Sequence, residues 1–485
     1  MAKDMEVESG VDRISALPEG VICHILSFLP TKVAVQTSVL STKWRKIYTS
    51  VSSIDLEFGT LDDDREEIDA EKSNRFSNFV DRVFFFHDKP SIVSFRLKCY
   101  QYVDPLHVDG WIRALMQHSI QELDIYNHHF AFLGMPLPAS VFSCETLVVL
   151  KVNLNSSYHA LKVPARICLP NLKVLHMHDF SFSNDGSGEK LLSSCPVLED
   201  LVLGSCAFNN NHSEFKISNS SLRRLTLEDY YTELSDQFVQ IMICAPNLLL
   251  FKCTSGLRLD VILCNLSSLE DAHINVRAYA HEVYLVSYRV RVLKLLLGIQ
   301  GVKSLFLSNH TIEALSYGGN LHTDLPTFHN LKFLQVDWPS VEYPREFEGT
   351  IQTPKELMDI LQKTPNLNYL GMREGLEPDA LSQEKVILNA VPQCFISSLK
   401  RLDIAAFDGT ATEVPFLKYL LENATLLQKM SIFCTEKLSA NLEKQEEIKN
   451  ELELFCADTT SCVIEFLPWN NWKYVPVRNF VPDSF

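Results

Sequence analysis

The chain has 485 residues, 46% of them hydrophobic and 21% charged, which is typical of a soluble globular protein with more than one domain. Its formal net charge of −16 argues against a general nucleic-acid binder, because phosphate contacts require a basic surface. No apolar run reaches the ~18 to 20 residues that a membrane span needs, and residues 1–10 lack the apolar core of a secretory signal. We therefore expect no nucleic-acid or membrane partner and a location in the cytoplasm, the nucleus or both.

The first predicted elements are three short helices within residues 12–48. Pro18 suits the first position of a helix, and Pro30 ends that helix because a proline disfavours the α conformation in the residue before it. Thr31 and Ser41 can cap a second and a third helix, the third carrying Trp44. The first helix has an apolar stripe at helical spacing, formed by Val21, Ile22, Ile25, Leu26 and Leu29. So small a segment buries too little apolar surface to be stable alone, so its remaining apolar groups need cover from elsewhere.

The same stretch, DRISALPEGVICHILSFLPTKVAVQTSVLSTKWR, resembles an F-box of the plant type, and only Thr42 and Lys43 depart locally from its usual pair of basic residues. The resemblance implies docking onto a Skp-type adaptor that links the chain to a cullin-based ubiquitin ligase. Trp44 is expected to serve both the helical core and the interface, whereas Leu26 is assigned to internal packing. The candidate adaptor contacts are Leu17, Pro18, Ile22, Ile25, Leu29, Val39 and Trp44.

A polar linker separates this F-box, placed at 10–56, from the rest of the chain. Residues 57–90 contain an acidic run, expected to be a solvated loop, and then a connecting helix at about 74–86 with phenylalanines on one face. We expect the F-box to help cap the first structural unit beyond this linker.

Residues 91–389 carry a repeated L-x-x-L-x-L pattern. Clear copies begin at Leu147, Leu172, Leu198, Leu222 and Leu248, with spacings of 24 to 26 residues, and periods of 20 to 29 mark leucine-rich repeats. Segments such as LLSSCPVLEDL, IMICAPNLLL and ILQKTPNLNYL predict a helix, a turn and then a strand in each unit. Stacked units make a continuous core, so the expected fold is an α/β solenoid, or horseshoe, with its strands on the concave side. The regularity of the repeats between 269 and 367 is left open by the looser spacing there.

The C-terminal part, 390–467, contains AVPQCFISSLKRLDIAAFDGTATEVPFLKYLLENATLLQKMSIFC, which resembles the FBD region of plant F-box proteins. A charged helix at about 440–456 and a strand at SCVIEFL are predicted after it, before a tail at 468–485. Together the two resemblances identify the chain as a member of the plant F-box/FBD/leucine-rich-repeat family. They imply an N-terminal three-helix F-box, a repeat solenoid and a C-terminal FBD unit.

Target binding is predicted on the strand face that points away from the core, because loops and concave surfaces carry recognition in solenoids. A merely solvated inner face is the alternative, since the charges there are mixed. His176 and His178 alternate beside Asp179, which favours polar or peptide contacts over a metal site. The candidate positions are Lys151, His176, Asp200, Thr226, His273, Phe306, Gln335, Tyr369 and Asp403.

The sequence offers no catalytic chemistry. GxSxG, GxxxxGK[ST], GxGxxG and HExxH are absent, and the 13 cysteines contain no CxxC pair, so no enzyme activity, metal or cofactor is expected. The favoured function is the substrate-recognition subunit of a Skp–cullin–F-box (SCF) ubiquitin ligase. The alternatives are a small-molecule sensor, which would need more basic residues than the scattered Arg224, Arg373 and Arg401, and a non-ligase F-box scaffold.

Overall fold

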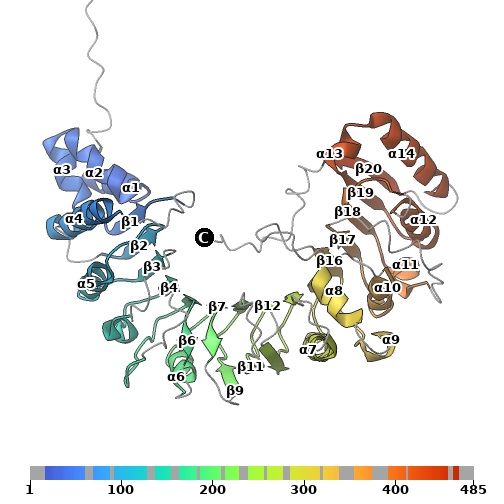
Figure 1. The fold of residues 1–485 in the computed structure, drawn as a ribbon, viewed down its shortest axis with the longest axis horizontal. Helices are drawn as coiled ribbons and strands as arrows, with labels where there is room; N and C mark the ends of the chain where they lie inside the picture. Colours follow the sequence, from blue (N-terminus) through green and yellow to red (C-terminus); the bar gives the residue numbers. More distant parts are fainter. Residues whose placement is uncertain are drawn as a thin grey trace, which may run out of the picture. The chain divides into compact units, whose positions relative to one another are not determined.

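The computed structural model falls into two compact units, Met1–Asn211 and His212–Phe485, which are described separately (Figure 1). In each unit a ladder of parallel strands lies on one side and the helices on the other. The residues that the structure describes are 17–60, 69–87, 92–127, 137–153, 163–182, 186–208, 214–228, 239–255, 259–276, 285–316, 321–337, 354–373, 391–410, 413–456 and 462–468.

The first unit begins with the predicted three helices, α1 (Glu19–Leu26), α2 (Thr31–Gln36) and α3 (Thr42–Tyr48), with a 3-10 turn η1 (Thr37–Val39) before the last. Pro18 and Pro30 lie one residue before the helices rather than within them, and their carbonyls accept the first backbone hydrogen bonds of α1 and α2. The Ser41 hydroxyl caps α3 as expected, accepting a hydrogen bond of 3.3 Å from the backbone N–H of Trp44.

A small apolar core holds these helices together. Its buried members are Ile22, Leu26, Ala34, Trp44, Ile47 and Val51, with Leu17, Cys23, Leu29 and Tyr48 packed partly against it. The core is too small to stabilise a free domain by itself.

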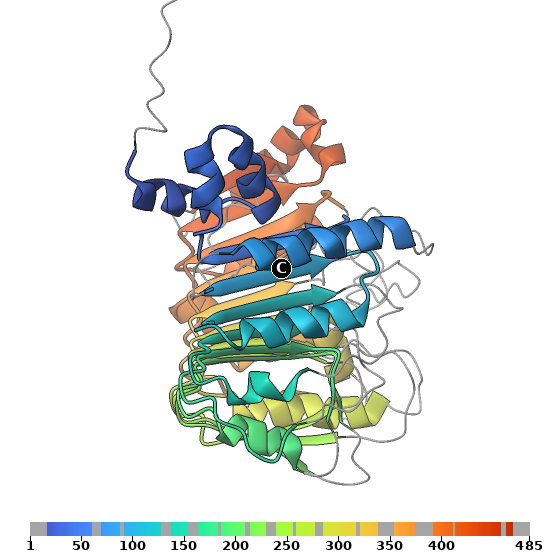
Figure 2. The same cartoon turned by 90° about the vertical axis from the view of Figure 1, so that its left-hand side faces the viewer.

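The helices therefore dock onto the first strand of the repeats, β1 (Ser53–Phe58), and onto α4 (Ala70–Phe86). The Thr31 hydroxyl accepts a hydrogen bond of 2.8 Å from the Asp55 backbone N–H. His87, directly after α4, places its ring Nε2 at 2.8 Å from the Val51 carbonyl oxygen, to which it donates. In Figure 2 the dark blue helices lie beyond the β1 edge of the ladder, where the F-box was expected to act as a cap.

The ladder strands of the first unit pair in chain order, each parallel to the next, and two short strands beside them pair with each other. The second and fourth residues of each ladder strand, such as Leu123 and Ile125, are buried under the helices, and the residues between them mostly face the other side. The remaining elements of this unit are β2 (Ser94–Cys99), α5 (Pro105–Leu115), β3 (Glu122–Asn127), η3 (Ala139–Ser143), β4 (Val149–Asn153), β5 (Val174–His178), β6 (Ser181–Phe182), α6 (Ser187–Ser193), β7 (Asp200–Gly204) and β8 (Ala207–Phe208).

The second unit continues the same architecture with a parallel ladder from β10 to β20. Its ladder strands are β10 (Arg224–Glu228), β12 (Leu250–Ser255), β14 (Asp271–Val276), β15 (Ser304–Ser308), β16 (Phe333–Asp337), β17 (Tyr369–Met372), β18 (Arg401–Phe407), β19 (Lys429–Cys434) and β20 (Val463–Pro468). Its helices are α7 (Leu285–Gly298), α8 (Asn309–Ser316), α9 (Leu321–Asp324), α10 (Pro354–Gln362), α11 (Gln393–Ser397), α12 (Glu413–Asn423), α13 (Glu436–Ser439) and α14 (Leu442–Cys456). Described strands thus recur through the region from 269 to 367.

One prediction about the second unit is wrong. The IMIC segment was expected to be helical, but Val239–Cys244 is a strand, β11, in an outer parallel sheet with β9 (Glu214–Ser218) and β13 (Leu259–Cys264). The reason is a period of two: Val239, Ile241 and Ile243 are buried while the residues between them are half-buried. Branched apolar residues in such alternation favour a strand over a helix.

Polar side chains at the turns connect successive repeats. Asn171 donates from Nδ2 to the Glu145 carbonyl at 2.8 Å, and Asn247, Asn330 and Asn366 make the same bond to Ser220, Gly301 and His329. Thr146, Ser398 and Thr425 use their hydroxyls in the same way. Each bond satisfies a carbonyl of the preceding turn, so this series of bonds adds to the strand pairing that holds successive repeats together.

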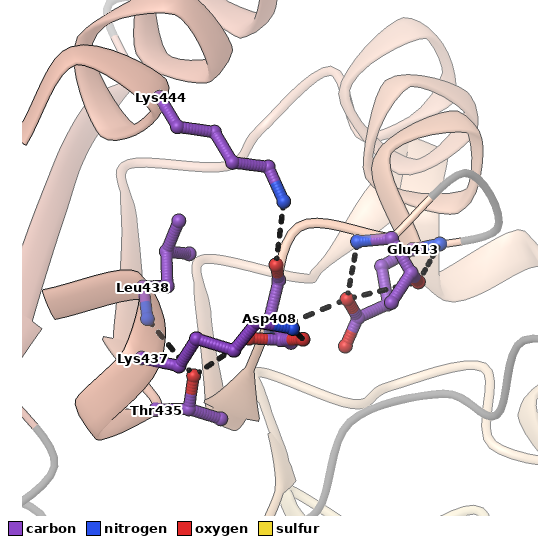
Figure 3. Close-up of polar contacts among 7 residues, drawn as sticks. Asp408, Glu413, Thr435, Lys437, Leu438 and Lys444 are labelled. Carbon is purple, nitrogen blue, oxygen red and sulfur yellow. Dashed lines mark hydrogen bonds and ion pairs between the residues drawn. The ribbon is translucent and has the colours of Figure 1, made fainter. Parts of the chain in front are cut away.

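A cluster of polar side chains around Asp408 and Glu413 connects several elements of the FBD region (Figure 3). The Glu413 carboxylate is buried and accepts hydrogen bonds from the backbone N–H groups of Asp408 and Thr410 and from the Thr410 hydroxyl. The Asp408 carboxylate accepts bonds from Thr435 and Lys437. These contacts join β18, α12 and the segment that leads into α13.

Burial raises the pKa of the Glu413 carboxyl above its ordinary value despite those hydrogen bonds. Burial acts in the same direction on Asp408, but hydrogen bonds from Thr435 and Lys437 outweigh it and lower the pKa of Asp408. Within the cluster, burial therefore disfavours the ionised form of Glu413, whereas hydrogen bonds favour the ionised form of Asp408.

Candidate functional site

The first candidate site is an exposed apolar surface on the N-terminal helices. Val21 and Ile25 on α1, and Phe28 in the turn directly after it, are spaced four and three residues apart and so lie on one side of the chain. Phe28 is 75% exposed and forms an edge-to-face ring contact with His24, with ring centroids 4.8 Å apart. We call the following exposed residues the F-box apolar surface: Val21, Ile25, Phe28, Val33, Val39 and Leu40.

This surface is large for so small a helical unit. Val39 is 84% exposed directly before the loop to α3, and Leu40 beside it is 65% exposed. Contiguous exposed apolar groups on soluble proteins mark interaction sites, whereas single ones are ordinary. The arrangement can bury apolar side chains of a partner protein, and it offers no chemistry for a reaction.

The predicted adaptor contacts divide into surface and core. Pro18, Ile25 and Val39 are exposed, and Leu17 and Leu29 are half-buried at the edge of the core. Ile22 is 0% exposed and Trp44 is 5% exposed, so the expectation that their side chains meet an adaptor directly is corrected. Both pack inside the helical unit and position the exposed groups around them.

Sequence reasoning missed Val21, Phe28, Val33 and Leu40, because it treated α1 as having one apolar stripe. The helix has two: Ile22 and Leu26 face the core, while Val21 and Ile25 face solvent, together with Phe28 in the turn that follows. A helix that is apolar on two faces has one face left for a partner, so the signal was present in the sequence.

The second candidate site is the strand face of the first unit, where charged residues alternate across the ladder. Asp55, Arg96, Asp124, Lys151 and His176 occupy one register row. Arg96 donates from Nε to the Asp124 carboxylate at 3.3 Å and has a nitrogen 4.0 Å from the Asp55 carboxylate. The alternating signs are therefore largely satisfied within the row.

Two predicted positions of this face differ from expectation. His176 is buried, and its Nε2 lies 3.7 Å from a carboxylate oxygen of Asp200. Asp200 itself pairs with Val174 in the neighbouring row, and Val202 aligns with His176 instead. The two-residue offset keeps Asp200 on the same face, because side chains alternate with a period of two.

His178 does not take part in a metal site with His176. Its ring packs against Gly204, where an added Cβ would lie 2.0 Å from Nδ1. Burial, followed by the neighbouring His176, lowers the pKa of His178 to about 4, so the ring is neutral at neutral pH. Among the described residues no group of three or more His, Cys, Asp or Glu side chains could hold a metal ion.

On the strand face of the second unit, four rings form a continuous stack that we call the aromatic ladder: His273, Phe306, Phe333 and Tyr369. The ring centroids of His273 and Phe306 are 3.9 Å apart, and those of Phe333 and Tyr369 are 4.3 Å apart with nearly parallel planes. Phe306 and Phe333 connect the two pairs at 5.3 Å. All four side chains are partly exposed, so the ladder presents its ring edges at the surface.

One end of the ladder is anchored by a buried carboxylate. Asp403 is 0% exposed and accepts hydrogen bonds from the Tyr369 hydroxyl at 3.0 Å and from the Arg401 guanidinium. The Arg401 guanidinium carbon also lies 5.9 Å from the centroid of the Tyr369 ring. At the other end, burial and then Lys252 lower the pKa of His273 to about 3, which keeps that ring neutral.

These contacts revise the predicted target-binding set. Thr226, His273 and Phe306 lie partly exposed in one register row, whereas Gln335 and Asp403 in that row are buried. Tyr369 belongs to the adjacent row and pairs with Phe333 and Arg401, with Gly371 in the expected place. Phe333 was missed, because the repeat pattern places it at a neighbouring position that the prediction did not consider.

Comparisons with known proteins give the class of the chain. An F-box domain model matches residues 14–53, an FBD model matches 389–432, and the leucine-rich repeats of FBD-associated F-box protein At5g56370 match 108–270. These matches cover the helical unit, part of the ladder and part of the C-terminal region, which together define an F-box protein with leucine-rich repeats.

Relatives extend over nearly the whole chain. F-box/LRR-repeat protein At4g14096 of Arabidopsis thaliana is 31% identical, covering 96% of this chain and 97% of its own. F-box/LRR-repeat protein At3g59200 is 31% identical over 97% of this chain and 94% of its own, and FBD-associated F-box protein At4g10400, also from Arabidopsis thaliana, is 30% identical over 94% and 100%. The chain belongs to the F-box/FBD/leucine-rich-repeat family, as its sequence resemblance predicted.

Family membership makes the chain an adaptor-type, substrate-recognition protein and implies binding of a Skp-type adaptor in general. Within the described ranges, no helix combines the length and apolarity that crossing a membrane requires.

Proposed function

We propose that the chain is the substrate-recognition subunit of an SCF-type ubiquitin ligase, acting in the cytoplasm, the nucleus or both. Its F-box apolar surface binds the Skp-type adaptor and through it a cullin, and its strand faces bind a target protein. The observation that carries the proposal is the exposure of the F-box apolar surface beside a buried core formed by Ile22 and Trp44. The helices are folded and docked on β1, yet none of the residues that the structure describes covers their outer apolar side chains.

In this role the chain accelerates ubiquitin transfer by proximity. Holding target and ligase core on one scaffold converts a bimolecular encounter into an effectively intramolecular one at millimolar effective concentration. The bond-forming chemistry belongs to other subunits, so the strand faces need only affinity and geometry. A rigid connection between the F-box and the repeats helps, and Thr31 and His87 supply hydrogen bonds for it.

We place target binding first on the aromatic ladder. Aromatic side chains supply large contact area at low entropic cost, and those here are held in place by stacking and by the Asp403 anchor. The charged row of the first unit is less suited, because its ion pairs are exposed and already satisfied.

Co-purification tests the adaptor half of the proposal. The double variant Val39→Asp/Leu40→Asp places two charges in the F-box apolar surface, and Leu106→Asp is the matched control, because Leu106 is a strongly exposed apolar residue on α5. The double variant should lose the adaptor and the cullin, while Leu106→Asp should retain both. Equal recovery from both variants would contradict the assignment, and adaptor without cullin from the unmodified chain would favour a non-ligase F-box scaffold.

Target capture tests the other half. Proximity labelling under proteasome inhibition identifies proteins that accumulate with the intact chain, and an F-box deletion should capture them without promoting their degradation. Phe306→Ala should then reduce capture, whereas Lys151→Ala on the first unit should leave it close to that of the unmodified chain. Reduced capture by Lys151→Ala with unchanged capture by Phe306→Ala would instead place the target site on the charged row of the first unit.

A further inference from the structure

The outer sheet of the second unit carries a feature that the proposed function does not use. Its strands β13, β11 and β9 are parallel, and the register between β11 and β13 aligns Gln240 with Asp260 and Met242 with Ile262. The same register places Cys244 directly opposite Cys264 at the ends of the two strands. Both thiols are free and both side chains are partly exposed.

This pair differs from the other cysteines of the described chain. Most are buried singly in the core, where they pack as small apolar groups: Cys99, Cys195, Cys206, Cys253, Cys394 and Cys434. Cys244 and Cys264 instead face each other across neighbouring strands and interact as hydrogen-bonding partners. Glu214 and Lys216 on β9, which have opposite signs, act electrostatically on the Cys264 thiol.

The geometry suits a covalent link. Neighbouring strands lie ~4.7 to 4.9 Å apart, and disulfide-bonded cysteines have Cα atoms ~4.4 to 6.8 Å apart, so directly opposite residues fall within the allowed range. We propose that Cys244 and Cys264 are a reversible oxidation site that forms an intramolecular disulfide when a peroxide acts as the oxidant. The site lies outside the F-box and the strand face, and it is independent of the proposed function.

The reaction balances in two steps. The Cys244 thiolate attacks one peroxide oxygen and breaks the O–O bond, which gives a sulfenic acid and, after protonation, one water from hydrogen peroxide. The Cys264 sulfur then attacks the Cys244 sulfur, forms the S–S bond and displaces the sulfenic oxygen as a second water. Two thiols and one hydrogen peroxide thus give one disulfide and two waters, and a thiol reductant reverses the reaction.

The order of attack follows from the surroundings of Cys264. Burial, then the neighbouring Cys244, raises the pKa of the Cys264 thiol, so it stays protonated at neutral pH. Cys264 is assigned the role of resolving thiol, which approaches a sulfur that is already oxidised. Partly exposed disulfides are the ones that cellular thiols reduce readily, which makes the link reversible.

The link would tie β11 to β13 around the segment that contains β12. Ladder strand β12 pairs with β10 and β14, so the disulfide would restrain the repeat at which the outer sheet and the ladder meet. The expected consequence is a higher thermal midpoint for the oxidised protein, because a cross-link lowers the entropy of the unfolded chain.

The test uses the full-length chain treated with hydrogen peroxide, with free thiols then alkylated and the digest mapped by mass spectrometry without reduction. We expect a peptide pair joined through Cys244 and Cys264 that dithiothreitol separates, together with a raised thermal midpoint. Cys244→Ser and Cys264→Ser should each abolish the pair and the shift. Cys144→Ser is the matched control, since Cys144 is a partly exposed cysteine that contacts Thr146, and it should change neither.

Three results would overturn the proposal. The first is that both cysteines stay alkylatable at peroxide concentrations that oxidise other thiols of the chain. The second is that either cysteine cross-links to a different partner, and the third is that the midpoint shift persists in Cys264→Ser.

Discussion

Two aromatic residues of the F-box, Phe28 and Trp44, should respond to truncation in opposite ways. Phe28 is 75% exposed in the turn after α1, and Trp44 is buried in the helical core. Replacing Phe28 by alanine removes a surface group and should leave folding nearly unchanged. Replacing Trp44 by alanine opens a cavity in a small core.

The size of the binding effect follows from the exposed area of Phe28. An aromatic side chain buries ~150 to 250 Å² when fully covered, so three quarters of it amounts to ~110 to 190 Å². At ~25 cal/mol per Å² this corresponds to ~3 to 5 kcal/mol, a loss of roughly 100- to 3000-fold in affinity for the adaptor. Trp44→Ala should instead cost ~3 to 5 kcal/mol of unfolding free energy.

Calorimetric titration with a Skp-type adaptor measures the first quantity, and denaturant unfolding of the same preparations measures the second. We expect Phe28→Ala to bind weakly with an unchanged unfolding midpoint, and Trp44→Ala to unfold early. An adaptor affinity within twofold of the unmodified chain for Phe28→Ala would refute the assignment of α1 as an interface. A stable Trp44→Ala protein that fails to bind would restore Trp44 to the surface set.

Three further predictions concern stability. Asn366→Ala removes the bond to the His329 carbonyl and should lower the unfolding free energy by ~1 kcal/mol in urea titrations; no change would mean that the turn bonds do not contribute. Gly204→Ala brings a Cβ against the His178 ring and should cost ~1 to 3 kcal/mol, seen as a lower thermal midpoint, unless the ring can move away freely. The pKa of Glu413 is raised on folding, so its ionisation opposes folding: the unfolding free energy should fall as pH rises from the unfolded pKa through the folded one, and Glu413→Gln should remove this pH dependence. Identical pH profiles of the two proteins would contradict it.

Sequence periodicity predicted the ladder well, because each strand leucine is forced inward by the alternation of a strand. Leu175 on β5, Leu201 on β7 and Leu225 on β10 are all fully buried, as the repeat pattern requires. The FBD helix α14 and the strand β20 also lie where the charge pattern and the apolar run predicted them.

Sequence alone did not give the correct structure where a segment fits both the helical and the strand period. It also failed where the neighbours of a side chain depend on how its strand pairs with the next. The segment around Ile241 is apolar and short, and helix and strand could be separated only by its pairing with β9 and β13. The two faces of α1 are both apolar, so the core assignment of Ile22 needed the packing of α3 against it. The aromatic ladder depends on register between strands that lie roughly thirty residues apart in the chain, a relation that no local pattern contains.

The central claim is that a folded helical unit keeps one apolar face bare until an adaptor covers it. Amide hydrogen exchange of the full-length chain, with and without a Skp-type adaptor, tests this most directly. The account predicts new protection in α1 and in the segment from α2 to Leu40, with β14–β17 unchanged. Protection confined to the strand faces, or none in α1 at saturating adaptor, would contradict it.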